Sequence, residues 1–532
     1  MRHFCAVVGT VLLGAAFAQA AGLPLIDAVK KENAAAVRTL ISQKADINSA
    51  EADGTTALHW AAQRDNLEIA NLLITAGAKV DALTRYNITP LAMAANNGNA
   101  AMIERLLKAG ADPNSTSREG QTALMTAAMN GRPEAVKMLL THGAKIDAVE
   151  PFKGQTAVMW AAGEGNADAV ALLIEFGANI NTKSKAGFTP LLFAVRNDRV
   201  AAAKVLLDHG ANVEDKTSDG TTALNIAAIN TYYDMGSLLL DYKANPNADD
   251  PRGNTLHTVA WLNHPGATWE AAALAEDPQT APRPNSRMTA LEFARKLLEH
   301  GADPNKRVDW KEQQMTKGLG TTRNPPNVYL GRHYLTFNGA TPFYLAAWAG
   351  DVKMMRLLVE FKADPKITNR YNVTPLMAAA CLDYYEGESP GPYTGVSEAE
   401  RLEAVKYALE MGSPIDAQTD FGQYPMIGGT EFTLLTYPLN FDDLDNMGVG
   451  DPRWNGMTAL HGAVISNQPT ILQYLVDKGA KLDVKNTLGW TPLMMTKGLF
   501  MANSKKEFPV AAKILTKAMV EKGLLTVETA AK

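Results

Sequence analysis

Residues 85–95 read RYNITPLAMAA, and residues 370–380 repeat the phrase almost unchanged as RYNVTPLMAAA. Related phrases occur throughout the chain, and each consists of a Thr, then apolar residues, then small residues. They begin at Thr56, Thr89, Thr122, Thr156, Thr189, Thr222, Thr255, Thr341, Thr374, Thr458 and Thr491. The first seven of these threonines follow one another at intervals of 33 or 34 residues. A fixed period of this size predicts a stacked array of repeats, each of them one supersecondary unit.

Each repeat can be interpreted as two short helices and a turn. Thr caps helix N-termini, and Pro at the first helical position loses no N–H that the helix needs. In the repeat that starts at Thr56, an Ala-rich first helix is followed by apolar residues at helical spacing, such as Ile69, Leu72 and Leu73. In the regular repeats a Gly-Ala or Lys-Ala pair stands 21 residues after the Thr and ends the second helix. Extrapolation back to Leu23 gives twelve repeats, of which the first and the last are degenerate.

Four features of these repeats together resemble the ankyrin repeat family. They are the 33-residue period, the T-[PA]-L-[HM]-x-A-A phrase, the Leu-Leu pair before Gly-Ala and the turn two residues before Thr. The resemblance spans roughly residues 23–520. It implies an all-α repeat solenoid with β-hairpin finger loops, an array of about twelve repeats in which two carry long insertions. It also implies a non-enzymatic scaffold for protein–protein interaction, with the fingers along the concave side.

The finger loops share a backbone requirement. The residue two places before each of the eleven threonines is Gly in nine cases and Asn in two, Asn87 and Asn372. Gly and Asn adopt the left-handed backbone conformation most readily. The pattern therefore predicts a tight turn with positive φ in every finger. Both asparagines also read as glycosylation sequons, but Thr89 and Thr374 are already explained as helix-starting residues.

The N-terminus has the features of a secretory signal peptide. An almost wholly apolar stretch, residues 4–18, leads into Ala18-Gln19-Ala20, which forms an A-x-A cleavage site. We expect cleavage after Ala20 and no membrane insertion afterwards. The mature chain would contain a single cysteine, Cys381, and therefore no internal disulfide. The resemblance to ankyrin proteins, which in eukaryotes are mostly cytosolic or nuclear, implies that a disulfide-free exported member belongs to the periplasm or the exterior of a bacterial cell.

Repeat spacing divides the chain into four segments: a signal peptide 1–20, regular repeats 21–254, repeats with long inter-helix and finger insertions 255–457, and C-terminal repeats with capping helices 458–532. The two enlarged fingers differ in charge, since residues 306–337 carry a net charge of +4 and residues 417–457 a net charge of −5. They either brace the array or form a clamp with one basic and one acidic side. As an alternative function, the loops 263–337 and 383–457 would build an enzymatic or small-ligand site.

No side-chain pattern points to catalysis, a cofactor or a metal. The nine histidines show no paired-ligand spacing, and no nucleophile or phosphate-binding motif stands in a supporting context. His59 and His461 instead occupy a His position of the ankyrin phrase. The formal net charge of −5 gives no reason to expect nucleic acid. We therefore expect a monomeric, non-enzymatic protein without a cofactor, whose partner is another protein.

Aromatic and Arg side chains near the fingers are the candidate partner-binding residues, because Arg, Tyr and Trp are enriched in binding hot spots. The resemblance places nine of them on the concave surface: Arg85, Tyr86, Arg118, Phe188, Trp348, Arg370, Tyr371, Trp454 and Trp490. Trp60, Trp160 and Phe193 stand at the fifth place of the phrase, which faces the core in ankyrin helices. We predict that these three side chains pack inside.

Overall fold

The computed structural model describes residues 23–218, 220–248, 250, 253–262, 286–308, 339–380, 382, 396–420, 455–487, 489–497, 499–501 and 504–526. The predicted signal peptide therefore lies outside the described residues. The chain divides into two compact bodies, Met1–Ser218 and Asp219–Lys532, called here the N-terminal body and the C-terminal body. Each body consists of helix pairs, and the described residues contain twelve such pairs. The predicted all-α repeat array is therefore confirmed.

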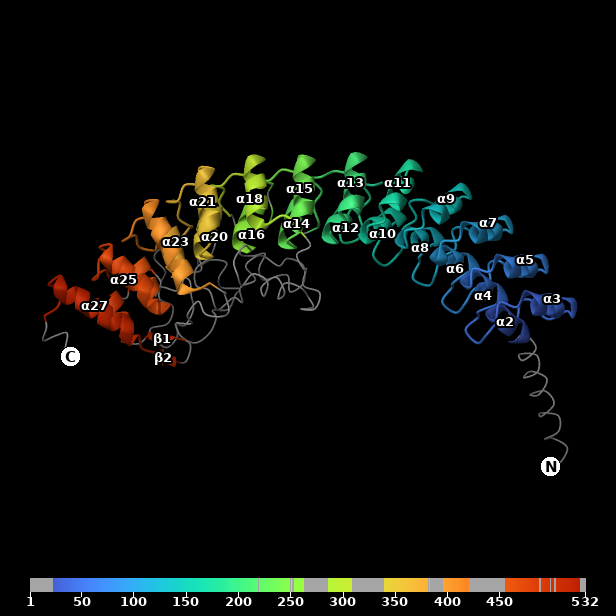
Figure 1. Cartoon of the computed structure of the whole chain (residues 1–532), viewed down its shortest axis with the longest axis horizontal. Coiled ribbons are helices and arrows are strands. Elements are labelled where there is room, and N and C mark those ends of the chain that lie inside the picture. The colour runs from blue at the N-terminus through green and yellow to red at the C-terminus, as the bar shows by residue number, and fades with distance from the viewer. Residues whose placement is uncertain are drawn as a thin grey trace, which may run out of the picture. The chain divides into compact units, whose positions relative to one another are not determined.

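The N-terminal body contains six helix pairs (Figure 1). They are α2 (Leu23–Lys30) with α3 (Ala34–Ser42), α4 (Ala57–Gln63) with α5 (Leu67–Thr75), α6 (Pro90–Asn97) with α7 (Ala100–Lys108), α8 (Ala123–Met129) with α9 (Pro133–Thr141), α10 (Ala157–Glu164) with α11 (Ala167–Glu175), and α12 (Pro190–Arg196) with α13 (Val200–Asp208). Within this body, the first helices of successive pairs stack beside each other, and so do the second helices (Figure 1). The finger loops lie on the side of the first helices.

The C-terminal body continues the same pairing. Its helices are α14 (Ala223–Ile229), α15 (Tyr233–Asp241), α16 (Thr255–Leu262), α18 (Ala290–Glu299), α20 (Pro342–Trp348), α21 (Val352–Glu360), α22 (Pro375–Ala379), α23 (Glu398–Glu410), α24 (Ala459–Ile465), α25 (Pro469–Asp477), α26 (Pro492–Met495) and α27 (Pro509–Glu521). The last pair differs from the others, because the strands β1 (Leu499–Met501) and β2 (Ser504–Lys506) form an antiparallel hairpin between its helices. The sequence did not lead us to expect this hairpin.

Side-chain caps start the helices as the phrase predicts. The Thr89 hydroxyl accepts a hydrogen bond from the N–H of Ala92 at 3.1 Å, and Pro90 takes the first helical position. Asn caps the second helices α3, α5 and α7, as when the Asn99 side-chain oxygen accepts from the N–H of Met102 at 3.0 Å. Such caps stabilise a helix by about 1 kcal/mol each. They compensate for helices that are too short to be stable in isolation.

The core runs along the array between the two layers of helices. In the second repeat Leu58, Ala61, Ala62, Ile69 and Leu73 are at most 1% exposed. The paired alanines let neighbouring first helices approach closely, while the leucines and isoleucines fill the space between layers. Full burial of a Leu or Ile side chain contributes about 1.5–3 kcal/mol, and each repeat buries its apolar face only because its neighbours cover it.

The finger turns have the backbone conformation that the sequence predicts. Asn87 has φ 58° and Asn372 has φ 57°, and all nine Gly residues at the equivalent position also have positive φ. In the described fingers, the two arms of a loop pair only through isolated β-bridges, such as that between Ala50 and Thr56, and form no extended strands. Within the described part of the chain, none of the helices combines the length and the apolar composition that a membrane span requires.

Candidate partner-binding surface

The finger between the second and third repeats shows how the tip residues are held outward. The Thr84 hydroxyl accepts hydrogen bonds from the N–H groups of Ile88 at 3.1 Å and of Tyr86 at 3.3 Å. The Asn87 N–H donates to the Thr84 carbonyl at 2.9 Å and closes the turn. The backbone of the loop is therefore satisfied internally, and the side chains of Arg85 and Tyr86 are left exposed.

Backbone hydrogen bonds also join one finger to the next within the N-terminal body. The Arg85 N–H donates to the Asp53 carbonyl at 2.7 Å, and the Arg118 N–H donates to the Tyr86 carbonyl at 2.9 Å. The Lys185 N–H donates to the Lys153 carbonyl at 2.9 Å. These bonds join the fingers of Asp53, Arg85 and Arg118 to one another, and the finger of Lys153 to that of Lys185. We call the tips at residues 83–86, 116–119, 149–153 and 183–186 the fingertip row. Its backbone is fixed before any partner arrives.

Tyr86 and the two predicted arginines of this row are exposed as expected. Tyr86 is 47% exposed, and Arg85 and Arg118 are exposed as well. The Arg85 guanidinium donates to the Tyr86 hydroxyl at 2.8 Å and lies 4.9 Å from the ring centroid. This pair presents an amphipathic surface of restricted freedom. Their role in binding remains a prediction.

The predicted residue Phe188 is only half-exposed. Its ring packs against Phe193 with centroids 5.4 Å apart, and the Arg196 guanidinium lies 5.6 Å from it. Phe188 therefore connects the base of a finger to the first helix α12.

The finger of residues 149–155 contains a surface residue that the sequence analysis missed. Phe152 is 67% exposed and Val149 53%. This finger has one residue more than its neighbours, because Thr122 and Thr156 are 34 residues apart. The longer interval was the sequence signal for an extra tip residue. The 34-residue interval alone did not indicate that the extra residue would be an exposed aromatic one.

A buried carboxylate stabilises the enlarged finger. Glu150 is 4% exposed, and its side chain accepts hydrogen bonds from the N–H groups of Phe152 at 2.7 Å, Lys153 at 2.8 Å and Gln155 at 3.0 Å. Burial opposes ionisation, but the N–H groups of Lys153, Gln155 and Phe152 outweigh it and lower the pKa of Glu150. The Glu150 carboxylate therefore interacts with N–H groups of its own loop and is not exposed at the surface.

The first helices also carry partly exposed side chains at the fifth position of the phrase. The prediction that Trp60, Trp160 and Phe193 pack inside is therefore only partly correct. Trp60, Met93, Trp160 and Phe193 are all half-buried. In α4 the exposed residue Gln63 follows Trp60 by three positions, which places both on one helix face. This face turns away from the helices that pack on α4, so the fifth position of the phrase is only partly in the core.

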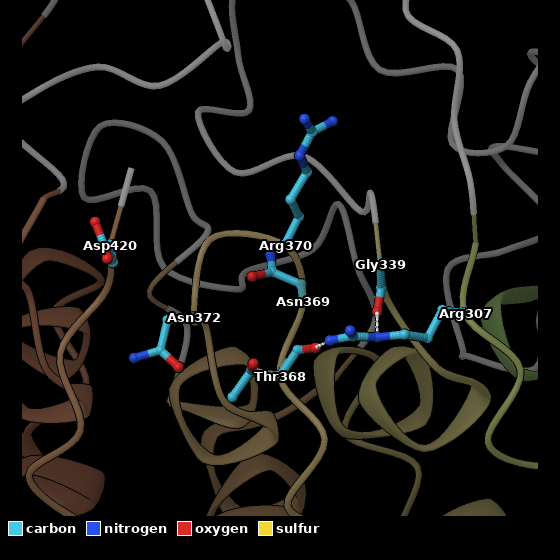
Figure 2. Close-up of a pocket in the computed structure, with 7 residues that line it drawn as sticks. All are labelled: Arg307, Gly339, Thr368, Asn369, Arg370, Asn372 and Asp420. Atoms are coloured by element: carbon cyan, nitrogen blue, oxygen red, sulfur yellow. Dashed lines mark hydrogen bonds between the residues drawn. The ribbon is translucent and has the colours of Figure 1, made fainter. Parts of the chain in front are cut away.

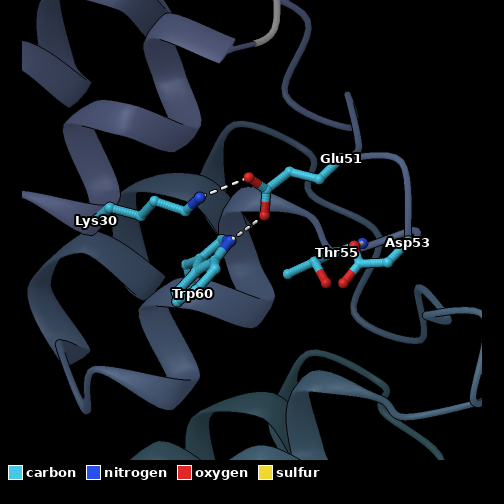
Figure 3. A network of polar contacts seen from close by, with 5 residues as sticks. All are labelled: Lys30, Glu51, Asp53, Thr55 and Trp60. Carbon is cyan, nitrogen blue, oxygen red and sulfur yellow. Dashed lines mark hydrogen bonds and ion pairs between the residues drawn. The ribbon is translucent and has the colours of Figure 1, made fainter.

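Polar contacts hold Trp60 in place at this surface (Figure 3). Figure 3 shows that the Glu51 carboxylate receives the Trp60 indole N–H at 2.8 Å and the Lys30 ammonium at 2.5 Å. The Lys30 ammonium also lies 4.4 Å from the centre of the Trp60 ring. Beside them, the N–H and the hydroxyl of Thr55 lower the pKa of Asp53. The tryptophan is thus a preorganised, half-open aromatic surface.

In the C-terminal body, the exposed Arg370 borders an open depression of about 610 Å³ (Figure 2). Its lining residues are Arg307, Gly339, Thr368, Asn369, Arg370, Asn372 and Asp420. Figure 2 shows the Arg307 guanidinium directed at the carbonyls of Gly339 and Thr368, with its Nε 3.2 Å from the Gly339 oxygen. Arg307 therefore ties neighbouring fingers together, and Arg370 is free to face the depression. The loops of the alternative ligand-site hypothesis lie largely outside the described residues.

Two of the predicted surface residues are buried. Trp348 and Tyr371 are each 4% exposed, so the expectation that they lie open on the finger side is wrong. Trp348 ends α20, and its carbonyl accepts from the buried Arg401 guanidinium of the neighbouring α23 at 3.0 Å. Helix α23 has 13 residues, whereas the second helix α21 has nine. The Tyr371 carbonyl accepts from the N–H of Asp420, which brings the next finger against it.

The two remaining candidate residues are Trp490 and Trp454. Trp490 is half-buried, and its N–H donates to the Asn486 side chain at 2.9 Å. Trp454 lies outside the described residues.

Histidines of the phrase have structural partners. His59 lies between the Thr56 hydroxyl at 2.8 Å and the Ile88 carbonyl of the next repeat at 2.9 Å. His461 makes the same contacts with Thr458 and the Trp490 carbonyl. Burial lowers the pKa of both imidazoles. Among the described residues, no three His, Cys, Asp or Glu side chains are grouped so that they could hold a metal ion.

Comparison with known proteins identifies the class that this architecture defines. Residues 12–84, 83–150, 124–217 and 159–250 match ankyrin repeats in three copies, and residues 338–370 and 455–487 match single ankyrin repeats. These matches cover more than half of the chain, and the protein belongs to the ankyrin repeat family. Ankyrin repeats generally mediate protein–protein binding and typically have no catalytic activity.

Solved structures also match this chain. The matching chains number 567. One of them is the crystal structure of the human ASB11 ankyrin repeat domain, which is 28% identical, with a TM-score of 0.39 over 42% of this chain and 99% of that chain. No curated protein matches the sequence.

Proposed function

We propose that this protein is a non-enzymatic scaffold that binds another protein through its fingers and first helices. The observation that carries the proposal is the fingertip row, in which backbone hydrogen bonds join the finger of Arg85 to that of Arg118 and the finger of Lys153 to that of Lys185. The side chains of Arg85, Tyr86, Arg118 and Phe152 remain exposed. A surface that is fixed beforehand loses little conformational entropy on binding. Aromatic and Arg side chains on such a surface are the types that dominate binding energy.

The first helices extend this surface inward. Trp60, Trp160 and Phe193 are half-open beside the fingers, and each can add apolar contact area without a change of rotamer. Phe193 is already positioned by Phe188, and Trp60 by Glu51. A partner that reaches between the fingers would therefore meet rigid aromatic rings.

Site-specific photo-crosslinking tests the proposal. A photoreactive amino acid replaces Tyr86 or Phe152 in the fingers, and a matched variant carries it at the exposed Lys137 of α9. After irradiation in the native host, mass spectrometry should identify the same crosslinked protein from both finger positions and not from position 137. Crosslinks from position 137 alone, or different proteins at random from all three positions, would contradict a binding surface on the fingers.

The proposal includes the site of action. The apolar stretch of residues 4–18 and the Ala18-Gln19-Ala20 sequence support export to the periplasm or the cell exterior, with cleavage after Ala20. N-terminal sequencing of protein from the native host should begin at Ala21. Recovery of a chain that starts at Met1 from the cytoplasmic fraction would refute export without affecting the binding proposal.

A further inference from the structure

We infer that the fingertip row binds an extended, acidic protein segment that carries aromatic or aliphatic anchor residues. This inference rests on the proposed function and names the chemistry of the partner. It is supported by the charge of the row, by the state of its cations, by its exposed apolar side chains and by its length.

The fingertip row is positively charged in a chain whose net charge is −5. Its exposed cations are Arg85, Arg118, Lys153, Lys183 and Lys185. Against them stand two acidic residues. Glu119 is exposed, whereas the Glu150 carboxylate is buried and engaged by the N–H groups of its own loop. The row therefore offers an excess of positive charge to a partner.

These cations differ from those on the second helices of the same body. On the second helices, Arg38 pairs with Glu68 at 2.5 Å and Lys108 pairs with Glu104 at 2.6 Å. Among the ion pairs between described residues, none includes a cation of the fingertip row. Arg85 donates to the Tyr86 hydroxyl and Lys185 to a backbone carbonyl. Among the described residues, compensation for these charges acts at longer range, since the charge of Arg85 acts on Asp53 and that of Lys153 on Glu150.

Apolar side chains alternate with the cations along the row. Leu83 is 52% exposed, Tyr86 47%, Val149 53% and Phe152 67%. The described part of the N-terminal body has six exposed large hydrophobic residues, and these four are the most exposed of them and lie in two fingers. Such a concentration marks an interaction site more than isolated exposed residues do. A partner segment would place its own apolar residues against these two fingers.

The length of the row fits a short extended segment. Neighbouring helices pack about 8–10 Å apart, so three repeat intervals from residue 85 to residue 185 span roughly 25–30 Å. An extended chain advances about 3.3 Å per residue, and eight or nine residues would therefore reach every finger of the row. Nucleic acid fits less well, because the sequence pI is about 6.0 and nucleic-acid-binding domains are typically strongly basic.

Fluorescence anisotropy with synthetic probes tests the inference. The main probe is a labelled peptide of about twelve residues, half of them Glu or Asp, with Phe and Leu between them. Its controls are the same peptide with Lys in place of each acidic residue, and a single-stranded DNA of similar length. We expect the full-length protein to bind the acidic peptide, and to bind it about tenfold or more weakly when the salt concentration rises from about 50 mM to about 300 mM.

Charge reversal on the row is the decisive perturbation. The variant Arg118→Glu/Lys153→Glu/Lys185→Glu should lose at least about tenfold in affinity for the acidic peptide. The variant Phe152→Ala should lose severalfold for the Phe-containing peptide and almost nothing for an analogue with Ser in place of Phe. That difference separates an anchor contact from general electrostatic attraction.

A matched control changes the same amount of charge elsewhere. Lys79, Lys137 and Lys145 are exposed outside the fingertip row, and their joint replacement by Glu should leave the affinity within about twofold of wild type. Circular dichroism spectra of all variants must coincide with that of wild type. Equal losses in both charge-reversed variants, or no binding of the acidic peptide at all, would overturn the inference.

The outcomes also separate the inference from the proposed function. DNA that binds more tightly than the acidic peptide, and is released by the fingertip variant, would assign the row to a nucleic acid and overturn the acidic-segment inference. If crosslinks from Tyr86 and Phe152 identify a protein partner while the acidic peptide does not bind, the scaffold function stands and the inference on partner chemistry fails. If neither crosslinks nor peptide binding occur, both fail.

Discussion

Lowering the pH should weaken the C-terminal body through two buried histidines. The His257 Nε2 donates to the Ala340 carbonyl of the next repeat at 3.2 Å, and the His461 Nε2 donates to the Trp490 carbonyl at 3.3 Å. The opposite nitrogen of His461 accepts from the Thr458 N–H at 3.1 Å. A second proton on that ring would face an N–H donor in a site that is 0% exposed. Burial together with this arrangement keeps the ring neutral.

The size of the effect follows from the pKa values. Burial lowers the pKa of His257 and of His461 from 6.5 to about 4. The unfolded chain takes up a proton on each ring near pH 6.5, and the folded chain does so only near pH 4. The stabilisation is complete above pH 6.5 and is lost as the pH falls from there towards 4. One pKa unit corresponds to about 1.4 kcal/mol, so each histidine loses on the order of 2 kcal/mol by about pH 5.

Hydrogen exchange measured by mass spectrometry resolves this effect by region. After correction for intrinsic exchange rates, peptides from α16 and α24 should show opening free energies that fall by about 2 kcal/mol between pH 7.5 and 5. Peptides from α8 serve as an internal reference, because Met125 stands where α24 has His461. The carboxylates add their own acid sensitivity only at lower pH.

A double variant, His257→Gln/His461→Gln, separates titration from structure. It should be less stable than wild type at pH 7.5, since each lost bridging hydrogen bond costs about 1 kcal/mol. Its opening free energies at α16 and α24 should then change little towards pH 5. The reasoning is refuted if wild-type α16 and α24 change by less than about 1 kcal/mol over this range, or if the double variant keeps the wild-type pH dependence.

Three further predictions concern stability. Gly462→Ala in α24 should destabilise the C-terminal body by about 1–3 kcal/mol in chemical denaturation, because a Cβ there would lie 2.8 Å from the Leu382 Cα. Gly163→Ala in α10 should instead be neutral or stabilising by up to about 1 kcal/mol, since its nearest neighbour would be 3.5 Å away, and a loss of stability would contradict the packing. Glu150→Gln should increase hydrogen exchange in residues 149–155 by weakening bonds worth about 1.5–3 kcal/mol, whereas unchanged protection would show that the loop does not depend on its carboxylate.

The sequence predicted the backbone of the repeats well, because the turns and helix starts depend on residues only a few positions apart in the chain. Positive φ at Asn87 and Asn372 follows from the turn chemistry of two residue types. The Thr caps follow from hydrogen bonds within four residues of chain. His461, the third residue of α24, contacts the Trp490 carbonyl of the next repeat, and His59 contacts the Ile88 carbonyl in the same way. The periodic sequence therefore determines the backbone conformation within a repeat and also the polar contact that a His makes with the next repeat.

Sequence predicted the surface less well, because exposure depends on neighbours that the repeat phrase does not contain. The tripeptide Arg-Tyr-Asn occurs at residues 85–87 and 370–372 with the same turn, yet Tyr86 is 47% exposed and Tyr371 only 4%. The Tyr86 carbonyl accepts from the N–H of Arg118, and the Tyr371 carbonyl accepts from the N–H of Asp420, so even the contact to the next finger is the same. The sequence that follows the two tyrosines differs, because the repeat spacing is regular after Tyr86 and is interrupted by insertions after Tyr371.

Chain length also decides what is displayed at residues 149–155. One extra residue there puts Phe152 at the surface, and it requires Glu150 to satisfy three N–H groups where Thr84 satisfies two in the shorter finger. An insertion in a repeat array therefore has two effects that can be separated. It creates new backbone donors that a buried side chain must accept, and it exposes a side chain that no neighbouring repeat can cover. For this reason the irregular finger, rather than the regular ones, is where partner specificity can be set most independently of the fold.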